Sequence, residues 1–400
     1  MTTVDFDLLI VGAGLVGSSL ALALKDSQLR VGLIEASPIE TNAQPNYDDR
    51  GIALSYSSVL IFQQLGLWSD LSAFATAIEQ IHISDRGHFG VTRLRAVDAN
   101  VPALGQVLTA KQLGQQLNTA LSSQPRIKSF SPHTVKAVMP QTDYVAVTLE
   151  DGQVLHSRLL VAADGQNSTI SSLLHLTSQQ QHYHQTAITT NVTPQRAHQN
   201  RAFERFTDTG PLALLPLSEN RCSLIWTVKT GEEQALLNLP DQVFLSRLQE
   251  RFGFRLGYFQ RTGQRHHYPL TLKQTSQTEP PRVILIGNAA QSLHPIAGQG
   301  FNLGLRDAAV LAEVVKKHTA DCGHQRCLQD YRDWQQPERN RIVNYTDGLV
   351  RLFSNDQTLL GHGRAAGLAM LDCLPPLKNQ LAQHFMGFCG RQSRLVRGQP

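Results

Sequence analysis

The first 35 residues alternate between apolar runs and a glycine-rich turn in the order expected of a strand, a helix and a second strand. One apolar run extends from Asp7 to Val11, and a second strand-like run extends from Val31 to Glu35. Between them, Leu15 to about Leu24 has apolar residues at helical spacing. The segment therefore predicts a βαβ unit, which is the building block of a parallel sheet.

Two further apolar runs lie far along the chain, and both end in turn-forming pairs. Leu159 to Ala163 precedes Asp164-Gly165, and Val283 to Ile286 precedes Gly287-Asn288. Strands buried on both faces have such continuous apolar runs, and ligand-binding turns follow their carboxyl ends. We therefore expect an α/β nucleotide-binding sheet that is assembled from distant segments.

The regions between and after these runs have other patterns. From about Thr186 to Val228 the chain is rich in β-forming residues, with Gly210-Pro211 and Pro216 as turn signals, which predicts a mostly antiparallel layer. From about Asp307 onward the pattern is helical, with an interruption at Pro375-Pro376. The predicted domains are a nucleotide-binding domain (1–75, 98–180 and 275–330), a substrate domain (76–97 and 181–274) and a C-terminal helical region (331–400).

The composition argues against several classes of protein. With 400 residues, of which 41% are apolar, the chain can bury a large core, which excludes a disordered protein. The net charge is only +4 and the basic residues are spread along the chain, so no nucleic-acid partner is expected. The five scattered cysteines, the early first strand and the lack of an apolar stretch of roughly 20 residues predict a cytoplasmic protein without a leader or membrane span.

The turn after the first strand has the sequence Gly12-Ala13-Gly14-Leu15-Val16-Gly17. This spacing is the dinucleotide fingerprint, in which the first glycine forms the turn, the second admits the pyrophosphate and the third lets the helix pack on the strand. Glu35, at the end of the next strand, is placed to accept hydrogen bonds from a ribose. We therefore predict a dinucleotide site, with a plain glycine turn beside a surface glutamate as the alternative.

A second glycine-rich segment extends from Gly287 to Asp307. It contains Gly298, Gly300 and Gly304 around Asn302 and leads into a helical pattern. Glycines let the backbone approach a flat ligand and present amide groups to it. We expect this segment to contact the ligand, and the alternative is a purely structural loop.

Together these motifs resemble those of the ubiquinone-biosynthesis hydroxylases, which belong to the single-component FAD-dependent aromatic hydroxylases. The resemblance covers about Asp5 to Asp307. It rests on these segments, in the family's order: Gly12 to Glu35, Asp49-Arg50-Gly51-Ile52-Ala53-Leu54, Gly105-Gln106, Asp164-Gly165, Gly287 and His294 to Asp307. It implies a Rossmann-like FAD-binding domain with an inserted, mostly antiparallel substrate domain and C-terminal helices, with NAD(P)H as the reductant.

Carried over by position, the resemblance implies a role for each motif. The glycine fingerprint and Asp164 would lie at the FAD pyrophosphate, Glu35 at the adenosine ribose, and Gly298 to Gly304 beside the isoalloxazine. The full set of implied FAD-binding residues is Gly12, Gly14, Gly17, Glu35, Arg50, Gln106, Asp164, Gly287, Asn288, Pro295, Gly298, Gly300 and Asn302.

One of these positions departs from the family. Most relatives carry Gly-Asp where this chain has Gly287-Asn288, and the family's aspartate binds a ribityl hydroxyl of the flavin. Asparagine keeps a carbonyl acceptor but loses the charge. We expect FAD to bind, with altered strength.

Three segments are most similar to the members that convert a 2-polyprenyl-6-methoxyphenol to the 1,4-benzoquinol. They are Ser84-Asp85-Arg86-Gly87-His88, Arg201-Ala202-Phe203-Glu204-Arg205-Phe206 and Gly287-Asn288-Ala289-Ala290-Gln291. The resemblance therefore implies a monooxygenase that uses O2 to hydroxylate a polyprenylated phenol. Alternatives are another ring hydroxylase of the same pathway, a flavin dehydrogenase or reductase, and a non-catalytic flavin-binding subunit of a quinone-synthesis assembly.

Other polar residues suggest weaker hypotheses. His294 is a candidate for proton handling, with a structural role as the alternative. His182-Tyr183-His184 and His266-His267 lack metal-site spacing, so no metal is predicted. Cys322 and Cys327 predict a polar loop between helices.

The end of the chain has a basic and amphipathic character. Leu377 to Phe388 carries spaced apolar residues, and Arg391, Arg394 and Arg397 follow it. Such a segment is typical either of a helix that settles on a membrane surface or of a terminal helix packed on the protein. The inner membrane and a quinone-biosynthesis assembly are therefore candidate partners beside the phenol and O2.

Overall fold

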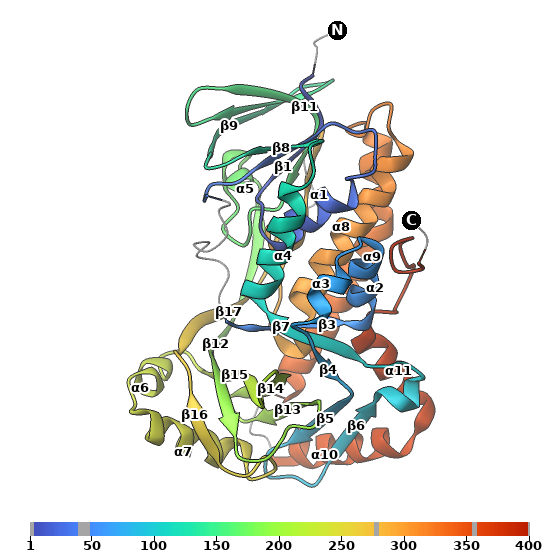
Figure 1. The fold of residues 1–400 in the computed structure, drawn as a ribbon. Coiled ribbons are helices and arrows are strands. Elements are labelled where there is room, and N and C mark those ends of the chain that lie inside the picture. Colours follow the sequence, from blue (N-terminus) through green and yellow to red (C-terminus); the bar gives the residue numbers. More distant parts are fainter. Residues whose placement is uncertain (1–3, 39–48, 276–279, 354–357, 399–400) are drawn as a thin grey trace.

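The computed structural model describes residues 4–38, 49–275, 280–353 and 358–398, which form an upper and a lower lobe in Figure 1. The upper lobe is built on a mostly parallel sheet and the lower lobe on a mostly antiparallel sheet. Helices α8 (Gln299–Lys317) and α9 (Gln325–Phe353) lie beside the upper sheet, and α9 continues down to the lower lobe.

The upper sheet has the strand order β8-β2-β1-β11, with β18 beside the second half of β11. All of these strands pair in parallel. Their bounds are β1 Phe6–Val11, β2 Val31–Ile34, β8 Ile127–Phe130, β11 Val154–Ala162 and β18 Val283–Leu285. The prediction of one sheet assembled from distant segments is confirmed. β1, β2 and β18 are buried at every position because both faces of the sheet are covered there.

β11 is longer than the predicted run from Leu159 to Ala163. Its first half pairs antiparallel with β10 (Val145–Leu149), which pairs with β9 (Val135–Pro140). This half of β11 has no continuous apolar run, which is the pattern that marked its second half. Buried and partly exposed residues alternate here instead, as they do in a strand with only one covered face.

Helices cover the parallel sheet and complete its core. α1 (Leu15–Ala23) lies between α4 (Ala110–Ser122) and α8. Apolar residues from all three helices and from β1, β2 and β11 form one buried cluster. Other helical segments of the described chain include α2 Tyr56–Gln64, α3 Trp68–Ser72, η1 Ala96–Ala99, α5 Thr169–Leu173, α6 Glu233–Leu237, η2 Gly287–Ala289 and η3 Ile296–Gly298.

The helical region begins earlier than predicted. We expected helices from about Asp307, but α8 starts at Gln299 and Asp307 lies in its middle, fully buried. Gly298 has a left-handed φ of +61° and caps the helix. Gly300 and Gly304 are therefore helical residues, although their low helix propensity favours a loop.

The lower sheet has the order β19-β17-β12-β15-β14-β13-β5-β6, with β16 also paired to β12. Its neighbouring strands are antiparallel except for β13 and β5. The bounds are β5 Gln80–Asp85, β6 Val91–Arg95, β12 Ser178–Pro194, β13 Arg201–Thr207, β14 Gly210–Leu217, β15 Arg221–Lys229, β16 Phe259–Thr262, β17 His266–Thr275 and β19 Gln291–Ser292. The mostly antiparallel layer is thus confirmed, and the long strands β12 and β17 join it to the upper lobe (Figure 1).

The two faces of this sheet pack against different elements. One face packs on α7 (Asp241–Phe252) through residues such as Phe203 and Trp226. The opposite face, which we call the inner face, carries Ala202 and Phe206 and packs against α9, α10 (Thr358–Cys373), α11 (Pro375–Met386) and η3. A small sheet of β3 (Gly51–Ser55), β7 (Gly105–Thr109) and β4 (Thr76–Ile78) lies between the lobes.

One interpretation of the C-terminal region is wrong, and one of its basic residues packs on the protein. Cys322 and Cys327 are fully buried in the upper core, and the Cys322 thiol donates to the Asp7 carbonyl, so they do not form a polar loop. Arg391 stacks on the indole ring of Trp334 at 3.7 Å. This arginine is therefore packed on α9.

Asp307 of α8 joins this helix to η2, β19 and α9. Its carboxylate accepts hydrogen bonds from the backbone N–H of Gly287 (3.0 Å) and the side chains of Gln291 (3.1 Å) and Gln335 (2.5 Å). Arg339 completes the site as an ion pair at 3.2 Å. A buried carboxylate requires such partners, and here they come from three separate elements.

Replacing Asp307 should therefore destabilise the whole upper lobe. In Asp307→Leu the Arg339 guanidinium loses its counter-ion, and removing one partner of a buried pair costs about 3–5 kcal/mol. Urea unfolding would measure this loss, with Lys316→Leu, an exposed position on the same helix, as the control that changes stability by less than about 0.5 kcal/mol. An Asp307→Leu protein as stable as the control would contradict this role.

Candidate active site

The predicted binding segments meet at one edge of the upper sheet. β1, β2, β11 and β18 run in parallel, so their carboxyl ends point the same way. At these ends lie, in strand order, the fingerprint turn 12–17, Glu35, Asp164 and the pair Gly287-Asn288. Ligands of open α/β sheets bind at this edge.

The three fingerprint glycines have different surroundings. Gly12 has a φ of +101°, and a Cβ there would lie 2.6 Å from the Ala163 carbonyl oxygen. A Cβ on Gly17 would lie 1.9 Å from the Gly12 carbonyl oxygen, so this glycine is required for the helix to pack on the turn. A Cβ on Gly14 would meet nothing within 4 Å, which leaves the space in front of the α1 N-terminus open to a phosphate group.

Glu35 is tied to the fingerprint turn. Its carboxylate accepts hydrogen bonds from the backbone N–H groups of Ala13 (2.7 Å) and Ser37 (3.0 Å). Each carboxylate oxygen has a second lone pair, and the side chain is partly exposed. Glu35 can therefore hold the turn and still accept a hydrogen bond from a ligand.

Asp164 has one oxygen without a partner. Its Oδ2 accepts from the backbone N–H of Ile170 at 3.1 Å, whereas the buried Oδ1 accepts no hydrogen bond from any described residue. An unsatisfied buried carboxylate oxygen is costly unless a ligand or water donates to it. Together with the open space at Gly14, this oxygen fits a dinucleotide bound along the edge.

The loop from β18 to α8 is anchored by Asn302. The Asn302 amide donates to the carbonyls of Ala53 (2.8 Å) and Gly298 (2.6 Å) and accepts from the Ser55 N–H (2.8 Å) and the Ser58 hydroxyl (2.7 Å). These four bonds use its full hydrogen-bonding capacity. Its side chain thus holds the loop on β3, and only its backbone is left to face a ligand.

The small sheet brings the remaining predicted residues to this loop. Gln106 on β7 is opposite Leu54 on β3, and Arg50 directly precedes β3 with its guanidinium 5.8 Å from the Tyr268 ring. A Cβ on Gly298 would lie 3.1 Å from the Ala53 Cβ, so η3 lies against β3. Pro295 and Gly300 belong to the same loop region, and Gly300 faces open space.

His294 is buried at the junction of the lobes. Its Nε2 lies 3.3 Å from Gln185 Oε1, and its ring packs edge-on against Tyr183. Nδ1 has no partner among the described residues, and burial lowers the pKa of His294 to about 3. The imidazole is therefore neutral around pH 7, and the proposed proton-handling role stays a prediction.

Sequence reasoning did not single out Glu204, which is a buried carboxyl of the lower sheet. This glutamate is only 8% exposed on β13 of the lower sheet, and burial raises its pKa to about 8. The available signal was its alternation with Ala202 and Phe206, which places a carboxyl on an otherwise apolar strand face.

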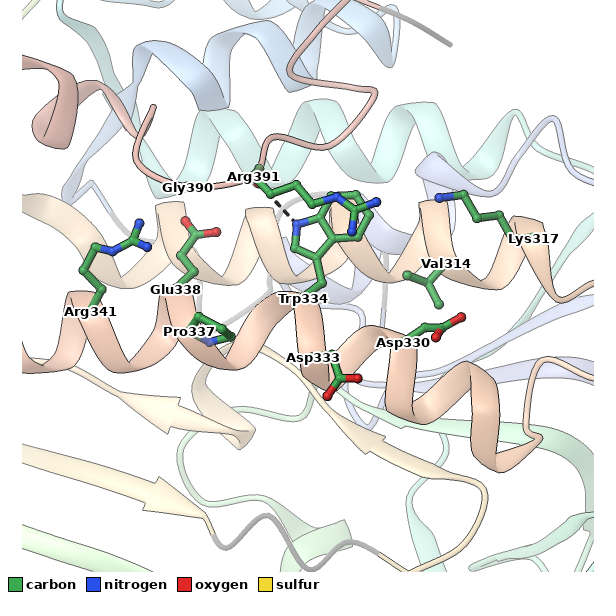
Figure 2. A pocket seen from close by; sticks show the side chains of 10 residues that line it. All are labelled: Val314, Lys317, Asp330, Asp333, Trp334, Pro337, Glu338, Arg341, Gly390 and Arg391. Carbon is green, nitrogen blue, oxygen red and sulfur yellow. Dashed lines mark hydrogen bonds between the residues drawn. The ribbon is translucent and has the colours of Figure 1, made fainter.

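Clusters of metal-binding side chains and other pockets lined by polar residues would be further candidate sites. The described His, Cys, Asp and Glu side chains include no group of three or more that could hold a metal ion. A pocket of about 460 Å³ lies between α8, α9 and the C-terminal segment, where Arg391 covers Trp334 (Figure 2). Its lining residue Glu338 pairs with Arg306 of α8, so the pocket extends along α8 and α9 from this ion pair to Lys317.

Comparison with known proteins identifies the family. The family model described as FAD binding domain matches residues 5–346. The chain is 35% identical to ubiquinone hydroxylase UbiL of Rhodospirillum rubrum, over 98% of this chain and 93% of that protein. It is 28% identical to 3-demethoxyubiquinol 3-hydroxylase of Escherichia coli, over 97% of this chain and all of that protein.

Solved structures give the same fold. The structure of p-nitrophenol 4-monooxygenase PnpA from Pseudomonas putida is similar with a TM-score of 0.81 at 19% identity, and the match covers 98% of this chain and all of that one. The FAD-binding hydroxylase fold predicted from the motifs is thus confirmed. The chain belongs to the ubiquinone-biosynthesis hydroxylases and is an FAD-dependent aromatic monooxygenase.

Proposed function

We propose that the protein converts a 2-polyprenyl-6-methoxyphenol to the 1,4-benzoquinol with FAD, NAD(P)H and O2. The observation that carries this proposal is the contact between the inner face of the lower sheet and the loop before α8. Ile296 of η3 and Ala53 of β3 belong to the same apolar cluster as the inner-face residues Ala202 and Phe206. An apolar face opposite the flavin loop suits an aromatic ring with a hydrocarbon chain.

The reaction sets clear demands on the protein. One atom of O2 enters the ring, the other leaves as water, and NAD(P)H supplies two electrons. FAD, when bound, provides the oxygen-activating chemistry. The chain itself must hold the ring in one orientation and exclude water.

The binding roles at the sheet edge follow from the open space at Gly14 and from the hydrogen-bond acceptors that still lack a donor. Gly14 admits the pyrophosphate, Glu35 accepts from the ribose, and Asp164 Oδ1 accepts from the cofactor or a bridging water. The exposed Asn288 accepts from the ribityl chain. Arg50 and Gln106 border the cofactor from the small sheet.

Two glycine substitutions should separate cofactor binding from folding. Gly14→Ala adds a methyl group to open space, so we expect the apoprotein to keep its thermal stability while FAD affinity falls at least about tenfold, or roughly 1.4 kcal/mol. Gly17→Ala should abolish soluble expression because its Cβ overlaps the Gly12 carbonyl oxygen. FAD titration by fluorescence quenching measures the first effect, and wild-type affinity in Gly14→Ala would contradict the assigned role.

The position of attack follows from the substrate. Both ring carbons beside the phenol hydroxyl are substituted, and the hydroxyl donates electron density to ortho and para carbons, so oxygen should enter para to it. β14, which packs on β3, β4, β7 and α9, would hold the ring in place.

Turnover of the purified protein under ¹⁸O₂ tests this function. We expect one labelled oxygen at the para carbon and NAD(P)H oxidation that depends on the phenol. A label at another carbon would instead favour a different ring hydroxylation, as the name of the Escherichia coli relative suggests for that protein. NAD(P)H oxidation without labelled product would favour a reductase, and neither activity would favour a non-catalytic subunit.

We also propose that the protein contacts a membrane surface through α10 and α11. Val97, Met370, Leu374 and Leu377 are 72%, 57%, 39% and 42% exposed, and we call them the helical patch. Lys378 lies 3.6 Å from Asp98 and 3.8 Å from Asp372, which places η1 and the α10–α11 junction together. None of the helices in the described ranges is long and apolar enough to cross a membrane. A polyprenylated phenol dissolves in lipid, so surface contact would give access to it.

Liposome flotation would test this contact. Leu374→Gln/Leu377→Gln should reduce the fraction of protein that floats with anionic vesicles, because it removes apolar side chains from the patch. Val243→Gln, at an exposed apolar position on α7, is the control. If the wild-type protein fails to float, the patch does not bind lipid, and a protein partner becomes the alternative occupant.

A further inference from the structure

Glu204 is a buried carboxyl without a partner. Its side chain is 8% exposed, and no hydrogen bond or ion pair joins it to another residue in the described ranges. Burying a carboxyl in this way destabilises a fold. A group that is kept at such a cost is a candidate for ligand binding.

The direction of this side chain follows from the alternation of β13. Phe203 packs on α7, whereas Ala202 and Phe206 lie on the inner face. Side chains two residues apart share a face, so Glu204 also lies on the inner face. Its direct neighbours across the sheet are Ile83 of β5 and Ala213 of β14.

Beside its apolar cluster, the inner face has an aromatic pair and an ion pair in the neighbourhood of Glu204. Tyr345 of α9 is close enough that the Glu204 charge adds to burial in raising the pKa of the Tyr345 phenol. The Tyr345 ring packs 4.0 Å from the His384 ring of α11, and burial keeps His384 neutral. On the same face Asp85 of β5 is paired with Arg364 of α10 at 3.1 Å. Asp85 also pairs with His88 at 3.3 Å, and none of these charged groups shifts the pKa of Glu204, which burial alone raises, so Glu204 is left for a ligand.

We propose that the Glu204 carboxyl hydrogen-bonds the phenolic hydroxyl of the substrate and so orients the ring on the inner face. This proposal rests on the proposed function. Ligand sites of this kind are mostly apolar with a few polar groups that fix orientation, and Glu204 is such a group on an apolar face. A substrate hydroxyl would also supply the missing hydrogen-bond partner.

The kinetic test compares two variants of the holoenzyme. Glu204→Leu should raise KM at least about tenfold, which corresponds to one lost hydrogen bond of roughly 1.4 kcal/mol, and lower the fraction of NAD(P)H consumption that yields product. Glu204→Gln should restore both values to within about threefold because the amide keeps a donor and an acceptor. Thr92→Val, which removes a buried hydroxyl from the edge strand β6, is the control that leaves KM unchanged.

A binding measurement and a stability measurement provide readouts besides turnover. Substrate-induced changes in flavin absorbance should require higher substrate concentrations in Glu204→Leu. Burial raises the pKa of Glu204 from 4.5 to about 8, so the folded state favours the protonated acid. Wild-type stability should therefore fall relative to Glu204→Gln as the pH rises from about 5 to 8.

The outcomes separate the two proposals. Wild-type enzyme that turns over the prenylated phenol, together with unchanged KM, product yield and binding in Glu204→Leu, would overturn the role of Glu204 alone. Wild-type enzyme that neither binds nor hydroxylates this phenol would overturn the proposed function and the role of Glu204 with it.

Discussion

The position of the glycine-rich loop depends on the buried carboxylate of Asp307. The segment between β18 and α8 contains Gly287 and Gly298, which both have a positive φ, and polar anchors fix it at each end. Asp307 ties the loop's beginning at Gly287 to α8 and α9. Asn302 ties its end to β3. The loop is thus held to the upper sheet and to the small sheet between the lobes, so its backbone is fixed at both ends.

Close packing against α1 also fixes the loop. Val16 of α1 lies against the loop, and a Cβ on Gly304 would come within 2.8 Å of its side chain and 3.1 Å of the Gly287 Cα. The fingerprint turn, η2 and α8 therefore approach at backbone distance. Glycine is needed at such contacts because any larger residue would separate the segments. Glycine therefore serves two purposes here. Gly14 and Gly300 border open space, whereas Gly17 and Gly304 allow two backbone segments to pack directly against each other.

The sequence predicted most of the upper lobe because its signals are local. A continuous apolar run marks β1, β2, the end of β11 and β18, and the fingerprint marks the first turn. β8 has no such run, because Lys128 and Ser129 in it are exposed. The start of α8 was misplaced because Gly300 and Gly304 have low helix propensity, and tertiary contacts outweigh it. Glu204 was overlooked for a different reason. Its burial depends on α9, α10 and α11, which come from distant parts of the chain, so no local pattern reveals that it lacks a partner.

Hydrogen-bond satisfaction separates structural from ligand-binding residues in this site. Asn302 and Asp307 lie in the family motif, yet the hydrogen-bonding groups of their side chains are already used by partners within the protein. Asp164 and Glu204, in contrast, each have carboxyl capacity that no described residue uses. One lies at the edge of the upper sheet and the other on the inner face of the lower sheet. Because unsatisfied buried carboxyls are costly, these two groups are the ones to test for a hydrogen-bonding ligand.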